Sequence, residues 1–194
     1  WRLPVDVLSI RFEGILRDMV GDCEETIMDN IIMLGEHGIT VETANDDMAG
    51  YYQKMEQAGK KEGIGRIGEL PQEIPFREFA KQLKERLGLD AIRLVGDGEK
   101  PIKRVGLCTG AGVEFVSLAA AKGCDAYLTA DIKYHEAQKA VEMGIAVADV
   151  THYASEVLIV PALQEKLQAA AKENGWNIEV VCSAVDGQTF WTIE

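Results

Sequence analysis

Two of the three histidines lie in the stretch 129–156, each after a short apolar run. The run 144–150 is typical of a buried strand, and a helical pattern begins near Tyr153. His152 and Glu156 are therefore four residues apart at a helix start, which puts both side chains on one face. A neutral imidazole and a carboxylate in that arrangement can share one divalent cation. The alternative is a first-turn histidine beside a solvated glutamate, and the spacing alone leaves both open.

A second pair of polar residues precedes this one. Asp131 and His135 are also four residues apart, and they follow the strand pattern of residues 125–130. Open α/β sheets usually carry their ligand-binding groups at the C-terminal ends of strands. If the loops after the two strands lie side by side, Asp131 orients the imidazole of His152, and His135 acts as a general acid or base. The alternative for His135 is a helix-surface histidine without a role.

Residues 109–112, Thr-Gly-Ala-Gly, form a glycine-rich turn between a strand pattern and a helix that runs through Ala121. Such a turn exposes backbone N–H groups, which suits an anion or a close ligand. The alternative is a tight strand-to-helix turn that binds nothing.

The chain as a whole predicts a layered α/β fold with a mixed sheet. Apolar alternation and short apolar runs predict strands at 39–43, 91–95, 102–108, 125–130 and 145–149, and a closing hairpin of strands at 177–183 and 188–193. Helical periodicity predicts helices at 24–38, 48–57, 75–87, 134–142 and 153–173. An aromatic and leucine stripe on the third of these helices is expected to face the core.

Two pseudo-repeated α/β units are expected. Residues 36–41 and 142–147 each describe a helix end, a glycine and a strand, and a polar turn follows each of them. If the two units face each other, the acidic turn with Asp46 and Asp47 approaches the His152/Glu156 pair and supplies further metal ligands.

The boundary between these units is predicted in a stretch rich in glycine and proline. Residues 61–75 are expected to be the linker. It separates a partial N-terminal α/β unit, residues 1–60, from a C-terminal α/β unit, residues 76–194, which carries the His/Glu motif.

Composition narrows the function class. The 194-residue chain has a net charge of −12, which makes nucleic acid an unlikely partner because such binding needs a basic surface. Four cysteines are scattered without a C-x-x-C pair, as free thiols in a reducing compartment are. No membrane span and no signal peptide are visible in the sequence. We expect a cytoplasmic protein that does not enter the membrane.

Several ordered motifs resemble one known family. They are Glu62-Gly-Ile-Gly-Arg-Ile-Gly-Glu-Leu-Pro71, Phe76-Arg-Glu-Phe79, Val105-Gly-Leu-Cys-Thr-Gly-Ala-Gly112, and TADIKYHEA from Thr129 followed by D-x-x-H-Y-x-S-E from Asp149. Their order resembles the GTP cyclohydrolase 1 type 2 homologues, also called dinuclear-metal-centre hexameric proteins. The resemblance implies that family's fold, and it implies that His152 and Glu156 bind metal.

The N-terminal half departs from the pattern of that family. The resemblance implies a His-His-Pro motif and a later His-Thr-Asn-x-Asp motif, and the first is absent from this sequence. The second matches Thr43-Ala-Asn-Asp-Asp-Met48, where Asn45 is nearest to the expected histidine. Two interpretations follow. Either this sequence lacks part of the N-terminal half, or the site is degraded or carboxylate-rich.

The resemblance implies divalent metal ions, either zinc, iron, manganese or magnesium, and a homo-oligomer in the form of a ring-shaped hexamer. It also implies a metal-dependent hydrolase whose substrate is a nucleotide or a related small molecule. The rival from another class is a non-catalytic oligomeric scaffold, or a partner-binding protein, with an incomplete metal site.

Overall fold

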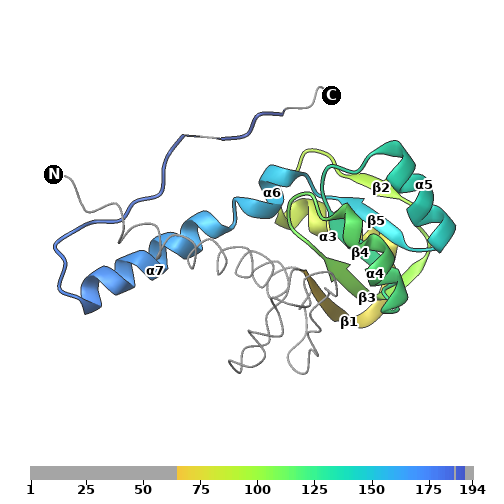
Figure 1. The fold of residues 1–194 in the computed structure, drawn as a ribbon, viewed down its shortest axis with the longest axis horizontal. Helices are drawn as coiled ribbons and strands as arrows, with labels where there is room; N and C mark the ends of the chain where they lie inside the picture. The colour runs from red at the N-terminus through yellow and green to blue at the C-terminus, as the bar shows by residue number, and fades with distance from the viewer. Residues whose placement is uncertain (1–64, 186, 191–194) are drawn as a thin grey trace.

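The structure is a computed structural model that describes residues 65–185 and 187–190 (Figure 1). Its centre is a five-stranded sheet in the order β1-β3-β4-β5-β2. The strands are β1 (Arg66–Pro75), β2 (Arg93–Val95), β3 (Pro101–Leu107), β4 (Ala126–Thr129) and β5 (Ala146–Asp149). The three central strands are parallel, and both edge strands are antiparallel to their neighbours. The predicted α/β class with a mixed sheet is confirmed.

Helices cover both faces of this sheet. They are α3 (Phe76–Arg86), α4 (Val116–Ala121) after the short 3-10 helix η2 (Val113–Phe115), α5 (Tyr134–Met143), α6 (His152–Glu156) and α7 (Ile159–Glu173). Successive residues of β4 alternate between two hydrophobic clusters, because neighbouring side chains of a strand point to opposite faces. One cluster contains the predicted stripe of α3, with Phe76, Phe79 and Leu83 at 0–1% exposure. The other contains side chains of α4 and α5.

The expected linker is wrong over most of its length. Residues 66–75 form β1, which pairs antiparallel with β3 along the edge of the sheet. Ile67 and Leu70 are buried in different hydrophobic clusters and anchor this segment to the core despite its glycine and proline content. The pairing register shifts between Glu69 and Ile74, and this irregularity accommodates Pro71 on an edge strand.

The C-terminal part differs from the predicted pattern in two ways. The single helix expected over 153–173 is divided into α6 and α7, which begins at Ile159. Pro161 lies in the first turn of α7, where its missing N–H is tolerated, and a continuous helix through it would lose the bond to the Val157 carbonyl.

The predicted closing hairpin is not formed in the described residues, since 177–183 contains no strand. This segment instead runs along α7, where Val180 N–H donates to Gln168 Oε1 at 2.9 Å and Gln164 Nε2 donates to the Val180 carbonyl at 2.9 Å. Figure 1 shows α7 leading away from the sheet, with this extended segment returning beside it. We call α7 together with residues 174–185 and 187–190 the C-terminal arm.

The predictions for the partial N-terminal unit lie outside the described residues. They include the helix at 24–38, the strand at 39–43, the first copy of the proposed repeat, and the acidic turn with Asp46 and Asp47. Within residues 65–185 and 187–190, no helix combines the length and the apolarity that crossing a membrane requires.

Candidate metal centre

A strained turn at the end of β5 starts the helix that carries the two candidate ligands. Thr151 has a φ of +62°, which is uncommon for a non-glycine residue, and its Oγ1 caps α6 by accepting from Ala154 N–H at 3.4 Å. The buried carboxylate of Asp149 accepts from Thr151 N–H at 3.2 Å and also pairs with Arg93 of β2. The turn is therefore fixed by part-buried polar contacts before the first helical residue, His152.

The two candidate ligands face each other from consecutive turns of α6. His152 Nε2 lies 3.2 Å from Glu156 Oε1, as the i,i+4 spacing predicts. Each side chain is 49% exposed, so a cation and its water can reach the space between them. An imidazole nitrogen and a carboxylate oxygen are suitable ligands for zinc and related divalent metals.

A second carboxylate holds the other ring nitrogen of His152. Asp131 follows β4, and its Oδ2 lies 2.7 Å from His152 Nδ1. The two loops are neighbours because β4 and β5 are parallel partners whose last residues, Thr129 and Asp149, lie opposite each other. An ionised carboxylate only accepts hydrogen bonds, so Nδ1 donates to Asp131, and in the neutral imidazole Nε2 then carries the lone pair that a ligand would use. The structure brings Asp131 to His152, as predicted for a carboxylate that orients the ring.

These contacts raise the pKa of His152 above its ordinary value. The largest cause is the hydrogen bond from Nδ1 to Asp131, and the negative charge of Glu156 acts in the same direction. Partial burial opposes them, because removal from water disfavours the charged imidazolium. A proton on Nε2 would therefore compete with any cation at that nitrogen.

The glycine turn after β3 forms another side of the site. Gly110 has a φ of +62°, and a Cβ built on it would lie 2.5 Å from Glu156 Oε1 and 3.1 Å from His152 Nε2. The backbone of Gly110 thus lies so close to His152 and Glu156 that only a residue without a side chain fits there. A larger residue here would occupy the space that the Glu156 carboxylate uses.

This turn does not offer its glycine N–H groups to an anion. Gly110 N–H donates to Ser155 Oγ at 3.0 Å, and Gly112 N–H donates to Thr129 Oγ1 at 2.9 Å. Because both donors are used within the protein, the structure favours the tight-turn interpretation over anion binding.

The donors present fit part of a metal site. No group of three or more histidine, cysteine, aspartate or glutamate side chains suited to one cation occurs within residues 65–185 and 187–190. His152 and Glu156 supply two donors, and a zinc-type site needs about four ligands. The other predicted ligands, Asp46 and Asp47, lie outside this range.

His135 is not brought to the pair by any contact seen in the described part of the chain. Its side chain is exposed in the first turn of α5, where Nδ1 lies 3.3 Å from Gln138 Oε1 and the ring meets Tyr134 edge-on. Its catalytic role stays a prediction.

Comparison with known proteins places the chain in a family. The family model for Duf34/NIF3 (NGG1p interacting factor 3) matches residues 18–188. The chain belongs to the Duf34/NIF3 family. The GTP cyclohydrolase 1 type 2 homolog of Streptococcus pneumoniae is 38% identical over 140 residues, which cover 70% of this chain and 52% of that protein. The protein of the same name from Bacillus subtilis is 31% identical over 136 residues, which cover 70% of this chain and 36% of that protein. The matched part of this chain therefore spans about half the length of the first relative and about a third of the length of the second.

Solved structures support the same fold. A Staphylococcus aureus protein, SA1388, superposes with a TM-score of 0.67 at 23% identity over 90% of this chain and 64% of that one. A Bacillus cereus protein related to NIF3 superposes with a TM-score of 0.66 at 21% identity over 93% of this chain and 59% of that one. The predicted family resemblance is confirmed.

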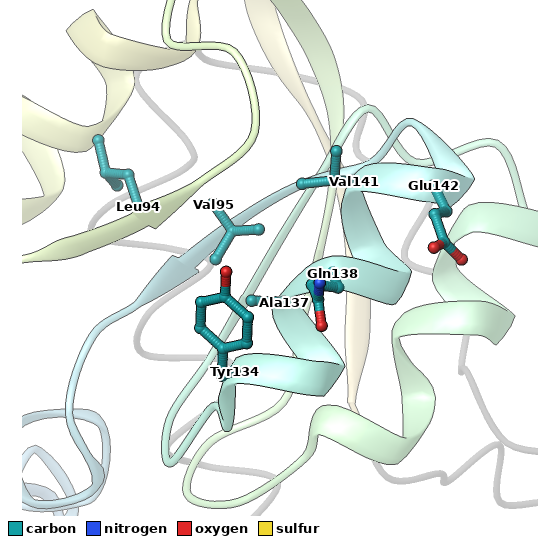
Figure 2. Close-up of a pocket in the computed structure, with 7 residues that line it drawn as sticks. All are labelled: Leu94, Val95, Tyr134, Ala137, Gln138, Val141 and Glu142. Carbon is teal, nitrogen blue, oxygen red and sulfur yellow. The ribbon is translucent and has the colours of Figure 1, made fainter.

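This Duf34/NIF3 chain also carries an open groove of about 410 Å³ between α5 and β2 (Figure 2). It is lined by Leu94, Val95, Tyr134, Ala137, Gln138, Val141 and Glu142. Figure 2 shows Tyr134 and Ala137 on the side of α5 that faces Val95. The lining is mainly apolar and includes neither His152 nor Glu156, so the groove is separate from the candidate metal centre.

Sequence reasoning missed the buried hydroxyls behind the site of this Duf34/NIF3 chain. Ser155 and Thr129 have no exposed surface, and each bonds the Gly110 loop. Ser155 stands inside the D-x-x-H-Y-x-S-E motif, which was the available signal. A small polar residue on the inner face of a helix start has to be satisfied by some buried partner.

Proposed function

We propose that this chain binds a divalent cation through His152 Nε2 and the Glu156 carboxylate, and that it is a metal-dependent hydrolase of a nucleotide or related small molecule. The observation that supports this most is the geometry of one imidazole. Its Nε2 faces Glu156 at 3.2 Å while Asp131 occupies Nδ1 at 2.7 Å. A carboxylate on the far nitrogen is the usual support of a metal-binding histidine, because it fixes the ring and its tautomer.

The residues of the chain have separate tasks in this function. A divalent cation with an open coordination position would lower the pKa of a bound water to near neutral, so that hydroxide could serve as the nucleophile. His152 and Glu156 hold the cation, and Asp131 keeps the imidazole oriented. His135 is proposed as the general acid or base, since its imidazole is exposed in α5, four residues after Asp131.

Asp46 and Asp47 are proposed to complete the ligand set from the N-terminal half. A site of one imidazole and several carboxylates suits zinc, iron, manganese or magnesium, with the harder cations favoured as carboxylates increase. The nucleotide substrate class rests on the name of the relatives, the GTP cyclohydrolase 1 type 2 homologs. A homo-oligomer, the ring-shaped hexamer, belongs to the same proposal.

One observation favours a different function. The described residues supply only two facing donors, and Asn45 stands nearest to the position where the resemblance implies a histidine ligand. A scaffold or partner-binding protein that keeps the fold without complete metal chemistry would have these features.

Elemental analysis of the purified full chain distinguishes the metal-dependent hydrolase from the scaffold or partner-binding protein. Metal binding predicts one to two equivalents of a divalent metal per chain, lost in His152→Ala and strongly reduced in Glu156→Gln. His135→Ala is the control for metal content alone and should keep the wild-type amount of metal, because it removes an exposed imidazole of α5 that does not contact the pair. A wild-type chain that is folded, remains metal-free after incubation with Zn²⁺ or Mn²⁺, and leaves nucleoside triphosphates intact would support the scaffold instead.

A further inference from the structure

The buried hydroxyl of Ser155 connects the two segments that border the proposed metal site. Its Oγ accepts from Gly110 N–H at 3.0 Å and donates to the His152 carbonyl at 2.8 Å. Ser155 is 0% exposed, so water cannot easily replace either bond. A single hydroxyl thus ties the glycine turn to α6.

The other side of Gly110 is fixed by β4 and the residue after it. Thr129 Oγ1 donates to the Gly110 carbonyl at 3.0 Å, and Ala130 N–H donates to the same oxygen at 2.9 Å. Thr129 is also 0% exposed. The backbone of Gly110 is therefore held between the sheet and Ser155.

The position of Gly110 matters because its backbone borders both candidate ligands. The Cβ position at residue 110 is 2.5 Å from Glu156 Oε1 and 3.1 Å from His152 Nε2. A shift of a few tenths of an ångström at Gly110 changes the space available to the carboxylate. The five-residue α6 is too short to fix the geometry by itself, since helices of this length are unstable without tertiary contacts.

We propose that Ser155 is a positioning residue of the metal site, whose hydroxyl holds the Gly110 turn against α6 so that His152 and Glu156 stay at the separation at which they share one cation. Ser155 itself does not touch the cation and acts through Gly110 and His152. The inference rests on the proposed function, because the separation of His152 and Glu156 matters for binding only if they share a cation.

Tyr127 provides a matched control. Its hydroxyl is buried and donates to the Gly112 carbonyl at 2.9 Å, in the same turn but two residues beyond Gly110. Tyr127→Phe removes a buried hydroxyl bond from this turn and leaves the bonds of Ser155 in place. It therefore reports what a loss of turn stability alone does to metal binding.

Titration of the metal-free full chain with Co²⁺, followed by visible absorption, tests the inference. Ser155→Ala is expected to bind Co²⁺ about 10- to 100-fold more weakly than wild type, the usual effect of removing a group that supports a ligand. Tyr127→Phe is expected to retain wild-type affinity and the wild-type Co²⁺ spectrum. Equal weakening in both variants, or none in Ser155→Ala, overturns the positioning role. Absence of Co²⁺ binding in wild type instead refutes the proposed function, and the inference with it.

A second measurement, hydrogen–deuterium exchange, tests the bond between Ser155 and Gly110 without metal. The Gly110 amide is expected to exchange slowly with deuterium in the metal-free wild-type chain, because its hydrogen-bond acceptor is buried. In Ser155→Ala this amide is expected to exchange faster, while the amides of β4 keep their protection. Rapid exchange of Gly110 in wild type would show that the bond to Ser155 does not hold the turn.

Discussion

At the scale of single residues, His152 uses its two ring nitrogens for two different partners. Nδ1 donates to Asp131, and Nε2 faces Glu156, so the ring stands between two carboxylates. This placement raises the pKa of His152, chiefly through the hydrogen bond with Asp131. A raised pKa means that the imidazolium is stabilised in the folded chain relative to the unfolded one. Its contribution to stability is therefore present below the ordinary histidine pKa of about 6.5 and is lost as the pH rises through the folded-state pKa.

Asp131→Asn tests this assignment in the metal-free chain. The neutral amide cannot stabilise the imidazolium as a carboxylate does, so the pKa of His152 is expected to fall toward its ordinary value. The titration of the ring, followed by NMR of its Cε1 proton, measures the change. The variant is expected to be less stable than wild type near pH 5.5 and equal to it well above the folded-state pKa, with a small difference because both side chains are about half exposed. An unchanged titration midpoint would show that Asp131 does not cause the shift.

At the scale of elements, local chemistry sets where the helices around the site begin and end. The helix α6 begins at the Thr151 cap, and α5 ends at Gly144, which has a φ of +72° and a ψ of +15°. The Gly144 N–H bonds back to carbonyls of the last turn of α5, so the left-handed residue satisfies the helix end. The turn leads directly into β5, whose end positions α6.

Gly144→Ala is expected to lower the free energy of unfolding by about 1 kcal/mol, the cost of a left-handed conformation for a residue with a Cβ. No heavy atom lies within 4 Å of the Cβ position, so the effect comes from the backbone and not from a clash. Urea denaturation followed by circular dichroism measures it. Gly144→Asn is the matched comparison and should cost less, because asparagine tolerates this conformation better. Equal stability of glycine and alanine at this position would contradict the assignment.

At the scale of the whole molecule, the sheet unit and the C-terminal arm differ in how they are buried. Both hydrophobic clusters of the described residues are built from 67–150, with Leu158 packed against one of them. The arm instead exposes most of its large apolar side chains, among them Val160, Leu167, Trp176, Ile178, Val181, Val185 and Phe190. The arm therefore adds little to the hydrophobic core of the described residues.

Truncation after Gly175 is expected to leave the sheet unit intact. Residues 176–185 and 187–190 contribute no side chain to either cluster, so hydrogen–deuterium exchange of peptides from β3, β4 and β5 should show unchanged protection. A matched truncation that also removes α6 and α7, ending at Val150, should lower the protection of β5, because it removes Leu158 and the Ser155 bond to Gly110. Loss of protection in β3–β5 after truncation at Gly175 would show that the residues beyond Gly175 stabilise the sheet.

The sequence alone determined the features that depend on local periodicity. The central strands follow apolar runs, α3 follows its aromatic stripe, and the i,i+4 spacing puts His152 and Glu156 on one face of α6. Each follows from repeats of about 2.0 or 3.6 residues, which the chain carries within a few residues of the element itself. The same local patterns predicted a linker at 66–75, which is a strand, and a strand at 177–183, which is not. Both errors have one cause, because a strand exists only where another strand pairs with its backbone hydrogen-bonding groups.

Only the tertiary structure decided which distant groups surround the pair. Asp131 is 21 residues from His152, and Gly110 is 45 residues from Ser155. The sequence predicted the contact between Asp131 and His152 only if the loops after two strands lay side by side. It indicated no role for Ser155. These contacts exist because β3, β4 and β5 are consecutive parallel neighbours, so their C-terminal ends meet at one edge of the sheet. Strand order is a property of long-range pairing, and no local pattern in the chain encodes it.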